Sequence, residues 1–117
     1  HRRLEEELLE AKPIVLVEGI LAFTHEALVK RMDLRVYVKA SDTVRLERRV
    51  RRDVAERGRT ADEVRHRFAT TVRPMHEAFV APSQSRADYV VEGTAVLEES
   101  VSHVLGWIRA RVSALHP

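Results

Sequence analysis

The sequence has no cysteine and no long apolar run, and these two absences exclude several classes of protein. Without cysteine there is neither a disulfide framework nor a thiolate metal site. No apolar stretch approaches the roughly 20 residues that a membrane-spanning helix needs, and no signal peptide is visible. We therefore expect a soluble, cytoplasmic protein.

Glycine is also scarce. The chain has four glycines and none precedes a lysine, so the phosphate-binding pattern G-x-x-x-x-G-K-[ST] is absent. The 117 residues, 44% of them hydrophobic, suffice for one modest domain with a core. The net charge is only +2, so the overall balance does not indicate nucleic-acid binding. Because the chain begins at His1 without methionine, we expect a piece of a longer protein or a processed one.

What the sequence does contain is a dense arginine run at residues 48–59, interrupted by Gly58. Its six arginines are Arg48, Arg49, Arg51, Arg52, Arg57 and Arg59. Arginine is permanently charged and binds phosphate through two parallel hydrogen bonds, so the run indicates a segment that handles a polyanion. The alternative is a solvated helix face whose arginines pair with Glu47, Asp53 and Glu56 along the helix.

Apolar periodicity predicts strands that alternate with helices. Short β-branched runs predict strands at residues 14–17, 34–38 and 88–91. Helices are expected at residues 2–12, 25–32, 42–57, 60–81 and 101–112. This order implies an α/β fold with a parallel sheet of about three strands and right-handed crossovers.

Local signals place the helix ends. Ser41 or Asp42 can cap the helix that carries the arginines, and Gly58 suits its C-terminal end. Residues 60–63 read as a capping box for the next helix, which Pro74 should kink or restart. The side chains expected to be buried are Leu46, Val50 and Val54 in the first helix and Val64, Phe68, Val72, Met75 and Phe79 in the second.

Several motifs occur together in a fixed order. They are Val17–Phe23, Arg48–Arg59, Val72–Glu77, Pro82 and Ala87–Val91. In this combination the chain resembles the C-terminal part of the uridine kinases (uridine–cytidine kinases), within the wider group that includes phosphoribulokinase. The match covers about residues 13–91. We therefore expect residues 1–117 to be the C-terminal part of a single nucleoside-kinase-like domain.

The resemblance implies a partial P-loop NTPase-type sheet flanked by helices, with an arginine-rich helical lid over the phosphates. It implies ATP and Mg²⁺ as cofactors and phosphoryl transfer to the 5′-hydroxyl of uridine or cytidine, a reaction of pyrimidine salvage. The expected partner is a nucleoside or another small acceptor, without nucleic acid or membrane, and the full-length protein is expected to be a homo-oligomer. The phosphate loop and the aspartate base would lie upstream, so the chain alone should be inactive.

The resemblance also assigns roles to individual residues. Glu18 matches the carboxylate near magnesium, an ion that prefers oxygen ligands. Ile20 matches the apolar residue beside the nucleoside. Arg49 and Arg52 match helix arginines that face the nucleoside, and Arg52 also faces the phosphates.

In the lid, Arg57 and Arg59 match the family's ATP-binding arginines that close on the transferring phosphate. We therefore expect Arg57 and Arg59 to be catalytic. Arg67 stands at a substrate-binding position where the family usually has a glutamine, which leaves pyrimidine specificity open. The adenine loop of the family is reduced here to residues 92–94.

Other interpretations remain at this stage. Glu18 could instead cap a backbone turn at the end of a strand. Arg67 motivates a phosphoribulokinase-like or other small-metabolite kinase. A third possibility is a non-catalytic module that binds anions or nucleic acid through the arginine run, although aromatic residues for base stacking are absent near it.

Overall fold

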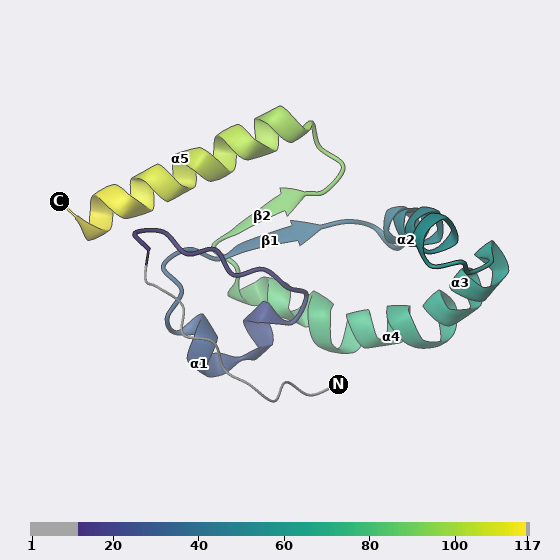
Figure 1. Ribbon diagram of the computed structural model, residues 1–117. Coiled ribbons are helices and arrows are strands. Elements are labelled where there is room, and N and C mark those ends of the chain that lie inside the picture. Colours follow the sequence, from purple (N-terminus) through teal and green to yellow (C-terminus); the bar gives the residue numbers. More distant parts are fainter. Residues whose placement is uncertain (1–11, 117) are drawn as a thin grey trace.

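The computed structural model describes residues 12–116, which form an elongated molecule of 54 × 40 × 26 Å (Figure 1). Except for Lys12, the helix expected at residues 2–12 lies outside the described residues. The main elements are α1 (Glu26–Val29), β1 (Val36–Lys39), α2 (Asp42–Glu56), α3 (Ala61–Arg67), α4 (Arg73–Met75), β2 (Tyr89–Glu92) and α5 (Leu97–Leu115). Across residues 12–116, none of the helices combines the length and hydropathy that a bilayer span requires.

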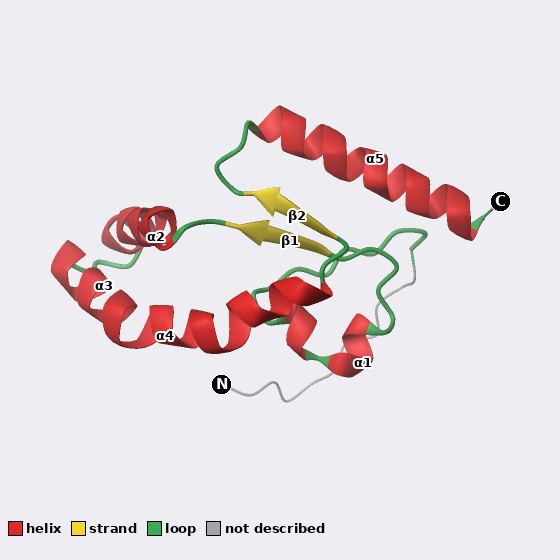
Figure 2. Ribbon diagram, turned by 180° about the vertical axis from the view of Figure 1, so that it is seen from behind, coloured by secondary structure: helices red, strands yellow, loops and turns green. Residues whose placement is uncertain are grey.

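Strands β1 and β2 form a parallel pair, as the alternating pattern predicts. The register places Val36 opposite Tyr89 and Lys39 opposite Glu92. The pair begins where the backbone N–H of Arg35 donates to the Asp88 carboxylate at 2.8 Å. Helix α5 lies along one side of the strands, and α1 and the helical run before β2 lie on the other (Figures 1 and 2). This confirms an α/β arrangement.

The prediction of a strand at residues 14–17 is wrong. This segment forms no strand, and its four apolar side chains are exposed, Leu16 to 85%. A strand needs a neighbour to complete its hydrogen bonds, and the two strands of the described residues pair only with each other. The sheet therefore has two strands and not three.

Helix α2 begins and ends where its sequence signals place it. The Ser41 hydroxyl accepts a hydrogen bond from the backbone N–H of Val44 at 3.3 Å, which caps the helix. After Glu56 the chain turns at Gly58, whose φ is +62°. That is the left-handed conformation that glycine adopts without steric cost.

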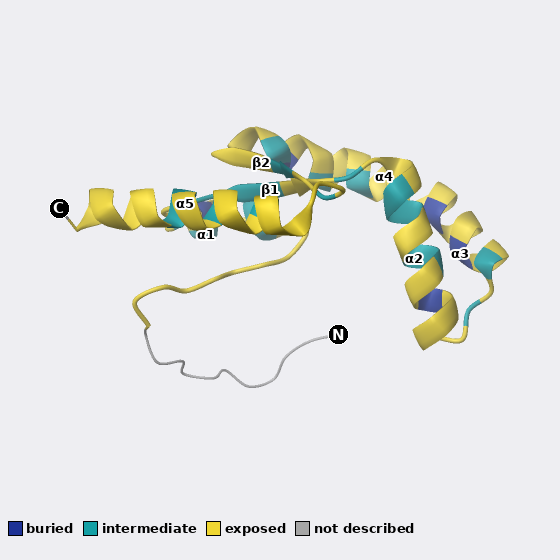
Figure 3. Cartoon of the chain, turned by 90° about the horizontal axis from the view of Figure 1, so that it is seen from above, coloured by how far each residue is buried: buried dark blue, intermediate teal, exposed yellow. Residues whose placement is uncertain are grey.

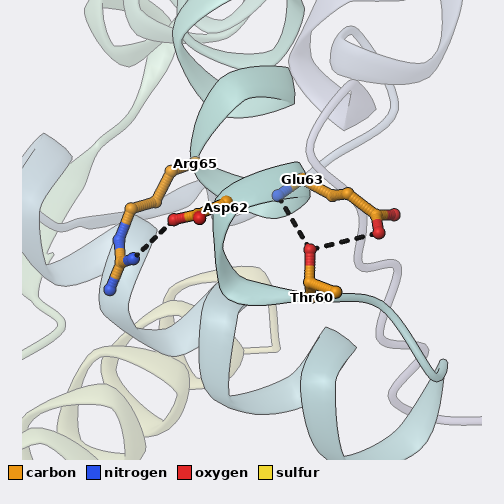
Figure 4. Close-up of polar contacts among 4 residues, drawn as sticks. All are labelled: Thr60, Asp62, Glu63 and Arg65. Carbon is orange, nitrogen blue, oxygen red and sulfur yellow. Dashed lines mark hydrogen bonds and ion pairs between the residues drawn. The ribbon is translucent and has the colours of Figure 1, made fainter.

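Helix α3 begins with the predicted cap. The Thr60 hydroxyl accepts from the backbone N–H of Glu63 at 3.2 Å, and it lies 3.1 Å from the Glu63 carboxylate (Figure 4). The hydroxyl can donate its proton to that carboxylate, so the Glu63 side chain bonds the Thr60 side chain. In a full capping box it would reach the backbone N–H of Thr60.

The helical run does not stop at Pro74. Residues 68–72 and 76–80 adopt wider π-helical turns on either side of α4, and residues 81–86 tighten into a 3-10 helix. Proline has no backbone N–H to donate to the preceding turn, and wider turns are a common way for a helix to absorb such an interruption. Figure 2 shows a continuous, bowed ribbon through this region.

The buried core is small and lies mainly between α2 and α3. Val64 and Phe68 are only 2% and 4% exposed, as predicted, whereas Val54, Met75 and Phe79 are exposed, contrary to the predicted stripe. The side chains of α2 and α3 cover one another, but no described element covers Met75 or Phe79. Figure 3 shows how few positions are buried across the molecule.

Replacing Gly58 by alanine is expected to lower the free energy of unfolding by about 1 kcal/mol, because a β-carbon disfavours the left-handed backbone. No atom lies within 4 Å of the added carbon, so the backbone alone sets this cost. Gly106, inside α5, is an opposite control, since Gly106→Ala should stabilise by up to about 1 kcal/mol. Urea unfolding would measure the free energy of unfolding of both variants. A change of the same sign in Gly58→Ala and Gly106→Ala would contradict the prediction.

Candidate anion-binding site

An open cavity of about 990 Å³ lies between residues 17–24, β1, α2 and the helical run 68–83. The charged side chains that line it come mainly from one face of α2. These arginines are Arg45, Arg48, Arg49 and Arg52. Positions 45, 48, 49 and 52 repeat at helical spacing, so a single helix face presents all four to the cavity. Such a concentration of guanidinium groups suits a polyanionic ligand.

The opposite wall is the turn that carries Glu18 and Ile20, and both line the cavity. The backbone N–H of Ala22 donates to the carbonyl of Gly19 at 3.2 Å, which closes a turn directly after Glu18. This turn leads into the 3-10 helix Ala22–Thr24. The cavity lining therefore combines a carboxylate and an apolar side chain with the four arginines of α2.

Phe68 and Arg45 connect the cavity to the core. The Arg45 guanidinium carbon lies 5.5 Å from the centroid of the buried Phe68 ring, a cation–π distance. Arg45 also forms an ion pair with Asp42, one turn earlier in α2. These two contacts hold Arg45 against α3 and limit the positions that its side chain can take.

Asp53 is the main polar residue of the core, with only 1% of its surface exposed. Its carboxylate oxygen Oδ1 accepts a hydrogen bond from Arg52 Nε at 2.9 Å and lies 3.6 Å from Arg57 Nη1. The hydrogen bond from Arg52 is the largest cause of a lowered pKa at Asp53, so the carboxylate is ionised. Asp53 thus supplies a negative charge within the arginine run.

The arginines also act on one another electrostatically. Burial is the largest cause that lowers the pKa of Arg49, followed by the charge of Arg52. Asp53 raises this pKa, whereas Arg57 and Arg67 lower it further. Several like charges are therefore close enough to repel, and an anion in the cavity would relieve that repulsion.

Arg48 ties α2 to the turn that follows β2. Its Nη2 donates to the carbonyl of Gly93 at 2.8 Å, while the Gly93 N–H donates to the carbonyl of Lys39 at 2.7 Å. A β-carbon at position 93 would lie 3.1 Å from the same Lys39 oxygen. Glycine thus permits a close approach of the turn to the end of β1.

The structure brings together four of the residues predicted from the sequence, because Glu18, Ile20, Arg49 and Arg52 all line the cavity. Arg57, Arg59 and Arg67 are not among its lining residues. Arg57 and Arg59 lie at the turn that ends α2, and Arg67 ends α3. The roles assigned to all seven residues stay predictions.

Four residues of the site or its support received no individual site role from the sequence: Arg45, Arg48, Asp53 and His76. Arg48 already belonged to the arginine run, and its spacing of three residues after Arg45 and four before Arg52 indicates a shared helix face. The sequence indicated Asp53 only as an ion-pair partner on a solvated helix face, because an acid among arginines on a helix is usually solvated. His76 lines the cavity through the helical run after Pro74.

A pH dependence is expected from His76, which is half-buried at the cavity. Burial is the main cause that lowers the pKa of His76, and the charge of Arg45 lowers it further. The carboxylates of Asp42 and Glu77 act in the opposite direction and raise this pKa. The folded state therefore binds fewer protons than the unfolded state, in which the pKa is about 6.5. The stability that neutral His76 contributes is fully present above about pH 6.5 and is lost as the pH falls through the folded pKa.

Urea unfolding at pH 7.5 and pH 5.5 checks this dependence. The loss of stability on acidification should be smaller in His76→Gln than in the wild type. His66→Gln, at an exposed position of α3, serves as the control and should behave like the wild type. An unchanged acid sensitivity in His76→Gln would contradict the assignment.

Metal ligands are few at this site. In residues 12–116, no group of three or more His, Cys, Asp or Glu side chains is arranged to hold a metal ion. Glu18 is a single exposed carboxylate at the cavity wall. That donor fits Mg²⁺, which keeps several waters and is bound by one or two carboxylates together with substrate phosphates. A single carboxylate does not fit an ion whose ligands all come from the protein.

Comparison with known proteins gives consistent matches. A model of the "Phosphoribulokinase / Uridine kinase family" matches residues 1–99, a wider span than the predicted 13–91. A uridine kinase of Chloroflexus aggregans is 38% identical over 109 residues, which cover 93% of this chain and 52% of the relative. A uridine kinase of Halobacterium salinarum is 37% identical over 106 residues, covering 86% of this chain and 47% of the relative.

A third relative, a uridine kinase of Geobacillus kaustophilus, is 43% identical over 83 residues, covering 71% of this chain and 39% of the relative. The chain thus spans about half the length of the curated relatives it matches.

Proposed function

The chain belongs to the phosphoribulokinase/uridine kinase family, and from this premise we propose that its whole protein transfers the γ-phosphoryl group of ATP to the 5′-hydroxyl of a pyrimidine nucleoside. The observation that carries the proposal is the convergence of four arginines and the Glu18 carboxylate on one cavity. The relatives that match most of the chain are named uridine kinases. A cytoplasmic location, a homo-oligomeric state and the absence of a nucleic-acid partner stay predictions.

In this proposal, residues 1–117 are the lid-bearing part of a single kinase domain. The glycine-rich phosphate loop that such a kinase requires is absent from the 117 residues. The phosphate loop and the base that accepts the hydroxyl proton would come from the rest of the whole protein. The described part supplies the arginine wall, the Glu18 turn and the lid at residues 48–59.

The arginines act by charge neutralisation. Phosphoryl transfer depends on positioning and on stabilising the charge that spreads over the phosphate oxygens. Arg52 lines the cavity and would bind the phosphates, while Arg49 would contact the nucleoside. Arg57 and Arg59, at the turn that ends α2, would close on the transferring phosphate. The charges of Arg52 and Arg57 lower the pKa of Arg49, and binding of a polyanion would relieve this repulsion.

Two groups on the opposite wall complete the site. Ile20 is exposed at the cavity and offers an apolar surface to the nucleoside. Glu18 would hold Mg²⁺, either directly or through a bound water. When bound, the ion neutralises charge on the β- and γ-phosphates and orients them.

A second acceptor class has one specific argument in its favour. Arg67 stands where the family usually has a glutamine that contacts the nucleoside, and this residue type motivates the alternative, although Arg67 does not line the cavity. A cationic side chain here would suit an acceptor that carries a phosphate of its own, as a phosphoribulokinase-like enzyme requires. Comparing uridine, cytidine and sugar phosphates as acceptors for the whole protein separates the two, since a preference for a sugar phosphate would favour this alternative.

The direct test compares the whole protein with residues 1–117. The whole protein, incubated with ATP, Mg²⁺ and uridine, is expected to form UMP, measured by chromatography. Residues 1–117 alone are expected to form none, because they lack the phosphate loop. Absence of any nucleoside phosphorylation by the whole protein would contradict the proposed function, and turnover by the 117 residues would contradict the proposed division of roles.

A further inference from the structure

We propose that Asp53 is a positioning residue, whose buried carboxylate holds the lid arginines in the arrangement that binds the polyphosphate. The inference rests on the proposed function, because it concerns the same site. It assigns a role to an acid that lies in the middle of the arginine run and does not itself reach the ligand, since Asp53 is not among the residues that line the cavity.

Both the side chain and the main chain of Asp53 bind lid residues. The carboxylate accepts from Arg52 Nε at 2.9 Å and pairs with Arg57 Nη1 at 3.6 Å. The carbonyl of the same residue accepts from the backbone N–H groups of Arg57 at 3.1 Å and Arg59 at 3.2 Å. One residue therefore fixes a helix arginine, the turn at Gly58 and the arginine that follows it.

Burial distinguishes this ion pair from the other pairs of the helical region. The Asp53 side chain is 2% exposed, whereas the Asp62 side chain, paired with Arg65 at 3.4 Å, is 98% exposed. An exposed ion pair of this kind contributes little to the stability of the fold, because water and salt screen the attraction between its charges. A buried carboxylate is retained only when it is paired and hydrogen-bonded, and its removal leaves its partners uncompensated.

The charge balance explains why a carboxylate suits this position. The guanidinium groups of Arg52, Arg57 and Arg67 all act on Arg49, and Asp53 supplies the opposing charge. One negative charge among four positive ones reduces the repulsion but leaves a positive surplus for the ligand. Arg52 donates Nε to Asp53, and within residues 12–116 its two terminal nitrogens have no hydrogen-bond partner, so they can bind phosphate in a bidentate manner.

This arrangement predicts a loss of ligand affinity when the Asp53 charge is removed without a change of shape. We would measure binding of inorganic tripolyphosphate and of ATP to the whole protein by titration calorimetry, together with kcat and KM for ATP. Asp53→Asn is expected to weaken tripolyphosphate binding about tenfold, because losing the arrangement of Arg52 and Arg57 costs on the order of one charge-assisted hydrogen bond and outweighs the gain in positive charge. Asp62→Asn is the matched control, with the same substitution at an exposed arginine pair, and should bind like the wild type.

A double-mutant cycle separates positioning from general loss of structure. If Asp53 acts through Arg52, then Asp53→Asn should have little further effect on tripolyphosphate binding in the Arg52→Ala protein. Full additivity of the two changes would overturn the proposal, as would wild-type binding by Asp53→Asn. Circular dichroism of each variant verifies the fold, and Asp53→Glu, which restores the charge, should recover part of the affinity if the single variant folds poorly.

The two proposals fail in different ways. A whole protein that binds tripolyphosphate but phosphorylates no acceptor would contradict the proposed function, while the Asp53 cycle would still decide the positioning role. Conversely, a functional kinase in which Asp53→Asn changes neither binding nor KM would overturn the inference alone.

Discussion

Replacing Arg59 by alanine is expected to lower kcat of the whole kinase by about 10³-fold, the lower range for an arginine that stabilises a phosphoryl-transfer transition state. Within residues 12–116, the Arg59 side chain forms no hydrogen bond or ion pair, while its backbone is held by the Asp53 carbonyl. A guanidinium group without a partner, carried by a backbone that is held in place, can meet charge that develops only during the reaction. The KM for ATP should therefore change much less than kcat.

Steady-state kinetics with ATP and uridine would measure this effect. Arg65→Ala is the matched control, because Arg65 is an exposed arginine on the neighbouring helix and, within residues 12–116, pairs only with the exposed Asp62 (Figure 4). That variant should retain wild-type kcat and KM. A loss of kcat below tenfold in Arg59→Ala, or an equal loss in Arg65→Ala, would refute the catalytic role.

Replacing Phe68 by alanine is expected to lower the free energy of unfolding by about 3–5 kcal/mol. Phe68 is 4% exposed and is one of three buried apolar residues in the described part of the chain, with Val29 and Val64. It also supports Arg45, which lies over the ring at 5.5 Å. The substitution would leave a void between α2 and α3 and free an arginine of the cavity wall.

Urea unfolding of the whole protein would test this expectation. Phe68→Leu keeps most of the volume and should cost less than about 1.5 kcal/mol. Thr70→Ala is a surface control on the same helical run, where the hydroxyl bonds only to the His66 carbonyl, and should change stability by no more than about 0.5 kcal/mol. A cost below about 1 kcal/mol for Phe68→Ala would show that this ring is not a main support of the core.

Features that depend on local sequence were predictable. The cap at Ser41, the turn at Gly58 and the cap at Thr60 each depend on residues close in sequence, and the structure places each where expected. The parallel pairing of the two strands also followed from the order of elements. The arginine spacing placed Arg49 and Arg52 on one face because helical geometry is fixed.

Features that depend on distant neighbours were not predictable. The apolar run 14–17 has the composition of a buried strand, but pairing requires a partner strand, and the described residues provide none to it. Met75 and Phe79 follow the helical stripe, yet they are exposed because no described element packs against them. Periodicity gives the side of a helix on which a residue lies and does not say what covers that side.

The sequence by itself determined the family, through motifs whose order and spacing are specific, and it determined which arginines share a helix face. The tertiary structure alone decided that Asp53 is buried among them and that Glu18 and Ile20 line the same cavity as the arginines. The physical reason is that burial and ion pairing depend on distances between segments far apart in the chain, whereas capping, turns and helical spacing depend on residues close together.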